Sequence, residues 1–395
     1  NAFALPGGYI YITRGLLALA ENESEVAGVL AHEIGHVTAR HSAQRYSSAM
    51  AANIGMTVLG VLGSAAGVPS GVGRMANFGA QVALQQYSQG QELEADMLGV
   101  RYMTRAGYSP DGMTSFFKKL RAHRDLEARE QGRNSVSHNI MSTHPRTEDR
   151  IRQAIKLAKE RTVKNPKVRR AAYLKAIDGL IFGDDPSQGV RRGRSFMHPD
   201  LRIAFAVPPG FVMFNSPRKV VAFGPEMSRI IFDMADPKEA KRVQSLTNYV
   251  GVAWGRHLND LQRAERLEIN GLQGATVQGR VSGQDGLRDV RLVVMRGDRE
   301  KIFRFAFITK PSETRRLSTE LRRTTFSFRR LSAKEAADIR PLRVRITTAK
   351  RDDTVASLAK RYPFERFQKE WFQLLNNMRL GDKIRPGQKI KMVTD

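Results

Sequence analysis

The sequence contains no cysteine among its 395 residues. Disulfide bonds and thiolate metal sites are therefore excluded, and any metal ion must be held by histidine and carboxylate side chains. The absence of cysteine does not indicate in which cellular compartment the protein lies. The chain also does not begin with methionine: Asn1 leads directly into residues typical of a domain interior, so we expect further residues upstream, which could include a secretory signal.

The sequence also lacks an uninterrupted apolar run that is long enough to span a membrane. Residues 46–73 carry no charged side chain, but Asn53, Pro69 and six glycines interrupt them, whereas a membrane span needs roughly 20 consecutive apolar residues. We expect a buried or membrane-skimming helical hairpin in this stretch. Two interpretations stay open, a lid hinged at residues 67–73 and a plain buried hairpin.

Acidic residues are scarce in the second part of the chain. The formal charge is +26; residues 1–165 hold 19 basic and 14 acidic residues, a net of +5, which leaves 46 basic and 25 acidic residues, a net of +21, for residues 166–395. A surface of this kind attracts polyanions, and we expect peptidoglycan or an anionic membrane surface as a partner. Nucleic acid is not expected, because aromatic and groove-reading motifs are missing.

Residues 32–36 read His-Glu-Ile-Gly-His. Residues four apart on a helix lie one turn above each other, so His32 and His36 can present two imidazole nitrogens to one metal ion. Glu33 is displaced sideways, beside the position of the water that such an ion carries, and is the candidate catalytic base. The spacing predicts a zinc hydrolase, which needs a third protein ligand and an open fourth position.

Asn22 and Glu25 have the pattern of a helix N-terminus, and we expect the helix that carries the histidines to run from there to about Arg45. His41 lies five residues after His36, on a different face of such a helix, so we interpret it as structural.

Before this helix, residues 3–5 and 9–13 predict a short hairpin around a Pro-Gly-Gly turn. The second strand either pairs with an extended substrate or belongs to an ordinary core hairpin, and the sequence favours neither.

A second helix is predicted to begin near residue 88 and to end at Gly107. Glu92 and Asp96 are four residues apart, so one face of it could supply a carboxylate ligand from Glu92 while Asp96 accepts a hydrogen bond from the far nitrogen of a zinc-bound histidine. Glu94 points elsewhere. Acidic helix segments are usually solvated, but the residues just before this one carry no charge, which favours the ligand interpretation.

Together these features resemble a family of zinc metallopeptidases that includes the HtpX-like, prenyl-protein and BepA-like proteases. The matching segments follow the family's order and are residues 1–8, 31–37, 92–96 and 142–145. The resemblance implies His32, His36 and Glu92 as ligands of one zinc ion per chain, Glu33 as catalytic base and Asp96 behind a ligand.

The resemblance also implies a mainly helical, zincin-like metallopeptidase domain with a short edge hairpin over residues 1–165. It implies protein or peptide substrates, and quality control of misfolded or misassembled envelope proteins, with the protein in the periplasm or associated with the envelope. A chaperone-like or cell-wall-binding factor whose protease is mostly latent is the alternative.

His144 precedes Pro145 and the predicted start of a helix. It could approach the metal as a partner of the transition-state oxyanion or as a removable fourth ligand. A structural role at the helix entry is the other interpretation, and both stay open.

The remaining chain predicts two further domains, which makes the whole an α+β multidomain protein. Residues 171–332 show short apolar or alternating runs between Gly, Pro and Asp turns, with helical patterns at residues 244–261 and 312–330, and predict an α+β domain around an antiparallel sheet. The sequence of this domain does not indicate its role. Residues 341–395 predict a strand, two helices and a strand, an order that resembles a LysM module; glycan binding and protein contacts both suit it.

Overall fold

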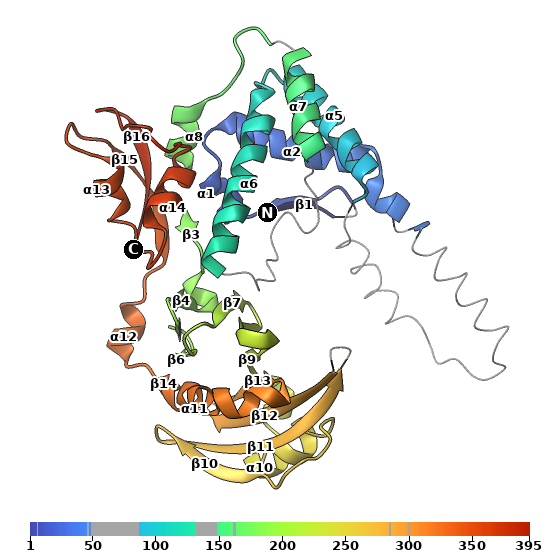
Figure 1. Ribbon diagram of the computed structural model, residues 1–395, viewed down its shortest axis with the longest axis vertical. Helices are drawn as coiled ribbons and strands as arrows, with labels where there is room; N and C mark the ends of the chain where they lie inside the picture. Colours follow the sequence, from blue (N-terminus) through green and yellow to red (C-terminus); the bar gives the residue numbers. More distant parts are fainter. Residues whose placement is uncertain are drawn as a thin grey trace, which may run out of the picture. The chain divides into compact units, whose positions relative to one another are not determined.

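The computed structural model describes residues 1–5, 7–45, 47–48, 87–131, 148–160, 163–283, 286–298 and 301–395. They form helices and antiparallel sheets, which confirms the α+β class, and divide into two compact units (Figure 1). The first unit combines Asn1–Glu130 and Val136–Phe182 with Arg343–Thr394, and the second is built mainly from Gly183–Leu342. The three-domain division of the sequence stays a prediction.

The N-terminal part of the first unit is mainly helical. The predicted hairpin is present as strands β1 and β2, which pair antiparallel with Phe3 opposite Tyr11. The elements of this part are β1 (Ala2–Ala4), β2 (Ile10–Ile12), α1 (Arg14–Leu19), α2 (Glu23–Thr38), α5 (Gln89–Arg105), α6 (Asp111–Gln131), α7 (Glu148–Glu160) and α8 (Arg170–Ile177). Helix α5 packs against both α2 and α7 (Figure 1).

Helix α2 begins as predicted but ends earlier. The Asn22 side chain accepts a hydrogen bond from the backbone N–H of Glu25 at 3.0 Å, so Asn22 is the N-cap. The Glu25 carboxylate accepts from the backbone N–H of Glu21 at 2.7 Å rather than from that of Asn22. The helix ends at Thr38 instead of about Arg45, because the chain turns at Arg40, whose φ of 56° is left-handed.

The C-terminal segment has the predicted element order. Strand β15 (Leu342–Thr348), helices α13 (Val355–Ala359) and α14 (Gln368–Leu375) and strand β16 (Lys389–Thr394) follow one another, and β15 pairs antiparallel with β16. A third strand, β3 (Ile181–Phe182), borders β15 and was not predicted.

Lys391 of β16 joins this segment to the N-terminal part of the first unit. Its ammonium group is buried and donates to the carbonyls of Ala18 and Ala20, at 3.1 and 2.8 Å, and it pairs with Glu21 at 3.2 Å. These carbonyls end helix α1 and would otherwise lack intrahelical partners. Burial lowers the pKa of Lys391 to about 8, against the opposing charge of Glu21.

The second unit is built around a seven-stranded antiparallel sheet in the order β10-β11-β12-β13-β9-β8-β7. Its strands are β7 (Val212–Ser216), β8 (Lys219–Phe223), β9 (Arg229–Met234), β10 (Glu265–Ile269), β11 (Leu272–Gly283), β12 (Gly286–Arg296) and β13 (Ile302–Thr309). A four-stranded sheet, β14-β6-β5-β4, comprises β4 (Val190–Arg192), β5 (Ser195–His198), β6 (Ile203–Ala206) and β14 (Arg329–Arg330).

Both faces of the larger sheet bury apolar side chains. Along β12, Val293 and Met295 belong to one core cluster, with Leu317 and Leu321 of helix α11 (Pro311–Ser327), whereas Leu292 lies in a second cluster on the opposite face. The alternation along the strand therefore follows the period of two that the sequence shows. The helical pattern at 244–261 is realised only as α10 (Leu246–Asn248) and a π-helical turn, Tyr249–Trp254.

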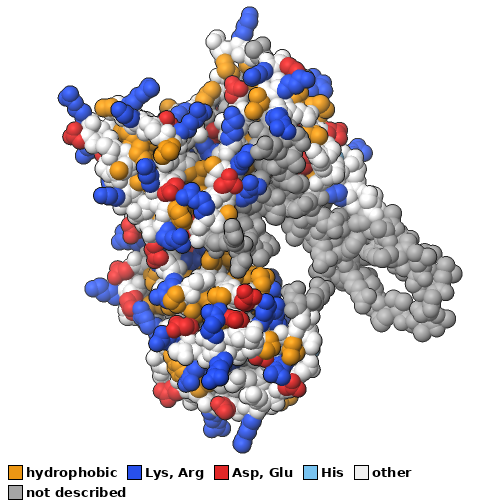
Figure 2. All heavy atoms as spheres, in the orientation of Figure 1, with side chains coloured by type: hydrophobic (Ala, Val, Ile, Leu, Met, Phe, Trp, Pro, Cys, Tyr) orange, Lys and Arg blue, Asp and Glu red, His pale blue; other side chains and the backbone are white. Residues whose placement is uncertain are grey.

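Basic side chains cover much of the surface without forming one patch on the face shown in Figure 2. In the part of the chain that the structure describes, no helix is both long and apolar enough to cross a membrane. Residues 49–73, the larger part of the expected hairpin with its lid interpretation, lie outside the described residues.

Candidate metal centre

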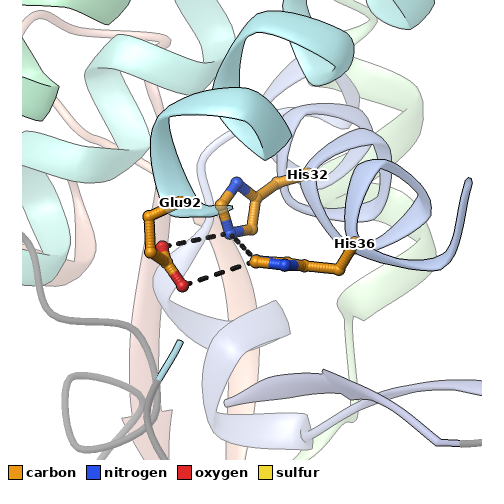
Figure 3. Close-up of side chains that lie close together, drawn as sticks. All are labelled: His32, His36 and Glu92. Carbon is orange, nitrogen blue, oxygen red and sulfur yellow. Dashed lines mark hydrogen bonds and ion pairs between the residues drawn. The ribbon is translucent and has the colours of Figure 1, made fainter. Parts of the chain in front are cut away.

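His32, His36 and Glu92 converge on one point between helices α2 and α5 (Figure 3). The two Nε2 atoms lie 3.1 Å apart; Glu92 Oε2 is 3.6 Å from His32 Nε2, and Oε1 is 3.4 Å from His36 Nε2. All three side chains are buried. Two imidazoles and a carboxylate are a donor set that suits a catalytic zinc ion, so these residues fit the metal that the sequence predicts.

Small residues at the crossing of the two helices let Glu92 reach the histidines. A Cβ atom added to Gly35 would lie 2.8 Å from the carbonyl oxygen of Ala95, and one added to Gly99 would lie 3.2 Å from the backbone nitrogen of His32. A side chain at either glycine would push α5 away from α2. The glycine inside the His-Glu-Ile-Gly-His segment is therefore a packing requirement of the site.

Asp96 and Arg150 hold His32 from behind. Asp96 Oδ1 lies 2.8 Å from His32 Nδ1, and Arg150 Nε and Nη2 each donate to the Asp96 carboxylate at 2.8 Å. Burial alone would raise the pKa of Asp96, but His32 and Arg150 outweigh it and lower this pKa below its usual value. An ionised Asp96 accepts a hydrogen bond from the Nδ1–H group of His32. The Nε2 atom of His32 then carries a lone pair, which is directed at the ligand cluster.

His41 is not one of the converging residues, but it supports the other histidine, a contact that the sequence-based interpretation did not include. His41 Nδ1 lies 2.9 Å from His36 Nδ1, and its Nε2 lies 3.2 Å from Glu94 Oε2. The early end of α2 is the cause, since the turn at Arg40 brings His41 back toward His36. Glu94 was expected to point away from the site. Its carboxylate instead contacts His41, which in turn contacts the ligand residue His36.

A neutral His41 has one proton arrangement that uses both contacts. Glu94 can only accept while ionised, so His41 donates from Nε2 and accepts at Nδ1 from His36 Nδ1–H. The Nε2 atom of His36 then carries a lone pair, as a metal ligand must.

We therefore expect His41→Ala to weaken zinc binding about 10- to 100-fold, the usual effect of losing such an outer partner. Competition of the purified chain with a fluorescent zinc chelator measures the affinity directly, without any assay of activity. His257→Ala removes an exposed histidine of the second unit and should leave the affinity unchanged. An unchanged affinity in His41→Ala would show that another group fixes the His36 tautomer.

Glu33 lies buried on α2 next to His32, and Tyr87 covers the other ligand histidine, His36. The Tyr87 ring stacks on His36 with centroids 3.7 Å apart and an interplanar angle of 19°. Burial raises the pKa of the Tyr87 hydroxyl, and the carboxylates of Glu33 and Glu92 add to this effect. The Glu33 carboxylate therefore lies near the ring that covers His36.

The sequence of this region is similar to that of a known peptidase family. Residues 1–158 match the profile of peptidase family M48.

Curated relatives match part of the chain as well. A β-barrel assembly-enhancing protease of Yersinia pestis is 36% identical over 162 residues, 39% of this chain and 31% of that protein. The protein of the same name in Escherichia coli K12 is 34% identical over the same shares. The mitochondrial metalloendopeptidase OMA1 of Schizosaccharomyces pombe is 30% identical over 164 residues, 42% of this chain and 45% of that protein. The chain thus spans less than half the length of these relatives.

Three residues around the candidate metal centre were not predicted to act there, namely Tyr87, Arg150 and His41. Tyr87 immediately precedes the helix-capping Ser88, which is the one local signal that it enters the site with α5. Arg150 contacts Asp96 from 54 positions away, and no local pattern indicates it. His144 lies outside the described residues, and its role stays a prediction.

Proposed function

We propose that this chain is a zinc-dependent metalloendopeptidase that hydrolyses peptide bonds of proteins, with His32, His36 and Glu92 as the ligands of one zinc ion. The convergence of these three side chains, with both imidazoles fixed by outer partners, is the observation that carries the proposal.

A zinc ion at this centre would supply a Lewis acid and a bound water with a pKa near 7. Glu33 would accept the proton of the attacking water on its carboxylate and return it to the leaving amine. Asp96 and His41 would keep the two ligand imidazoles in the tautomer that presents Nε2. The chain's own contribution is therefore a pre-arranged ligand set and one proton carrier.

Removal of a ligand tests the proposal. Because a site with two remaining ligands holds zinc weakly, His32→Ala and Glu92→Ala should each purify with about a tenth or less of the zinc found in the unaltered chain. Both should also fail to degrade unfolded casein. Mass-spectrometric metal analysis gives the zinc content, and His257→Ala is the matched control. Full zinc content in both variants would remove these residues from the ligand set.

We further propose that the substrates are misfolded or misassembled proteins of the cell envelope. The names of the bacterial relatives, which refer to β-barrel assembly, support this choice, although the match covers only part of this chain. The C-terminal β15-α13-α14-β16 segment would act as a LysM-like module that holds the enzyme at peptidoglycan, helped by the basic charge of residues 166–395. Co-sedimentation of the full chain with purified peptidoglycan tests this role.

A further inference from the structure

The second unit contains a cavity of about 720 Å³ between helix α11 and strands β10, β11 and β12. It lies at one end of the sheet face that helix α11 covers. Every second residue of β12 points to this face. Val293 and Met295 are buried in the apolar core, whereas Arg291 and Asp289, nearer the other end of the strand, line the cavity. Phe307 and Leu321 of the apolar core form part of its wall. The cavity therefore joins an apolar wall to a polar floor.

Four arginines and three acidic residues line this cavity, so its positive charges outnumber its negative charges. Asp289 is already satisfied, since it accepts from Arg280 Nε at 3.0 Å and from the Thr314 hydroxyl at 2.7 Å. The lining charges are Arg266, Arg280, Arg291, Arg322, Asp260, Glu265 and Asp289.

Arg291 and Arg322, like Arg266, are lining cations that have no close carboxylate in the described part of the chain. Among the described residues, no carboxylate oxygen lies within 4 Å of the guanidinium nitrogens of Arg291 or Arg322. In the same part of the chain, Arg291 forms one hydrogen bond, from Nε to the Thr276 hydroxyl at 3.2 Å. The N–H donors of the two Nη groups of Arg291 therefore remain available to a ligand.

These two guanidinium groups also repel each other. Burial lowers the pKa of Arg291, and the positive charge of Arg322 lowers it further, against a smaller opposing effect of Glu265. Arg291 is partly buried and Arg322 is exposed. An anion bound between the two guanidinium groups would relieve their repulsion and accept charge-assisted hydrogen bonds.

The rim of the cavity indicates what kind of anion fits. Asp260 and Glu265 repel ligands with several negative charges, so a phosphate or an anionic lipid surface is disfavoured and a single carboxylate is favoured. A planar carboxylate also matches the guanidinium fork. Leu267, Phe307 and the half-exposed Phe326 offer apolar contacts beside it.

Strand β10 supplies a place for an extended backbone. It lies at the end of the seven-stranded sheet, so its outer edge has no strand partner among the described residues, and Glu265–Leu267 of this strand line the cavity. Extended peptides bind such edges by main-chain hydrogen bonds.

From this combination we propose that the cavity of the second unit binds the free C-terminal carboxylate of a peptide that ends in an apolar residue. Arg291 and Arg322 hold the carboxylate, the apolar wall takes the last side chain, and β10 pairs with the preceding backbone.

Two labelled peptides test the site in the full chain. Both have the sequence Ala-Ala-Val-Ala-Phe with an N-terminal fluorophore; one ends in a free carboxylate and the other in an amide. Fluorescence anisotropy with the Glu33→Gln chain, which should not cleave them, gives both affinities. We expect the carboxylate peptide to bind about tenfold more tightly, the usual effect of a charged hydrogen-bond pair.

The variants separate the carboxylate site from other peptide contacts. Arg291→Gln and Arg322→Gln should each reduce binding of the carboxylate peptide about tenfold and leave the amide unchanged. Arg322 is exposed on α11, so its replacement should not affect folding, and Arg315→Gln, exposed on the same helix outside the cavity, is the matched control.

Equal affinities for the two peptides, or an unchanged preference in both variants, would overturn the proposal. So would stronger competition by inorganic phosphate than by acetate, or Arg291-dependent binding to anionic phospholipid vesicles, because these outcomes assign the cavity to a phosphate or a lipid. Since binding is measured without hydrolysis, failure of the peptidase proposal would not produce any of these results.

Discussion

Glu33→Gln should retain zinc and lose proteolysis. Glutamine has the shape of glutamate but cannot accept the proton of the attacking water, and loss of a general base typically lowers kcat by about 10²- to 10⁴-fold. The ligands His32, His36 and Glu92 are untouched, so zinc content should remain at one ion per chain. Casein degradation and metal analysis on the same preparation measure both quantities.

The matched control for this variant is Glu160→Gln. Glu160 is exposed on α7, so the same chemical change there should alter neither zinc content nor proteolysis. Full activity in Glu33→Gln would contradict the proposed mechanism. Loss of zinc together with activity would instead indicate that Glu33 contributes to metal binding.

The same variant decides between a protease and a binding factor in the cell. If hydrolysis is the main task, a strain that carries Glu33→Gln should show the defect of a deletion strain. If the chain acts chiefly as a chaperone or a cell-wall-binding factor, the point variant should grow like the unaltered strain, because the second unit and the C-terminal segment remain intact.

The candidate ligands could be proposed from the sequence because part of their information is local. His32 and His36 are one helical turn apart, as are Glu92 and Asp96, so helix periodicity alone places each pair on one face. Asn22 and Ser88 likewise identify the two helix starts through backbone hydrogen bonds a few residues long.

Of the outer contacts of the site, the one between Asp96 and a ligand histidine was predicted, whereas the others depend on tertiary structure and were missed. The place of His41 follows from the left-handed turn at Arg40, and a helix pattern carries no signal for such a turn. Gly35 reads as an ordinary helix residue until Ala95 is known to lie against it. Each of these features requires knowledge of how helices α2 and α5 cross.

The second unit shows the same limit for strands. Alternation located longer strands such as β13, whose most buried residues recur with a period of two. It missed short strands such as β4 and β10, which are only three and five residues long. The sheet order, and with it the unpartnered edge of β10, depends on pairings that no single stretch of sequence specifies.

Arg150→Met should destabilise the first unit by about 3–5 kcal/mol in the zinc-free chain. Arg150 is fully buried, forms two hydrogen bonds with Asp96 and also contacts Glu92, so its removal leaves buried carboxylates without their cation. Breaking a buried ion pair by removing one partner typically has a cost of this size. Zinc at the ligand cluster would compensate Glu92, so the loss should be smaller in the zinc-loaded chain.

Urea unfolding in a Trp254→Phe background measures this effect in the first unit alone. The chain has two tryptophans, and once Trp254 of the second unit is replaced, the fluorescence of Trp371 in α14 reports on the first. Lys156→Met removes an exposed cation from the same helix and should change the free energy of unfolding by less than about 0.5 kcal/mol. Equal midpoints for Arg150→Met and Lys156→Met would mean that the Asp96–Arg150 pair contributes nothing to stability, and that Asp96 is held against His32 by other contacts.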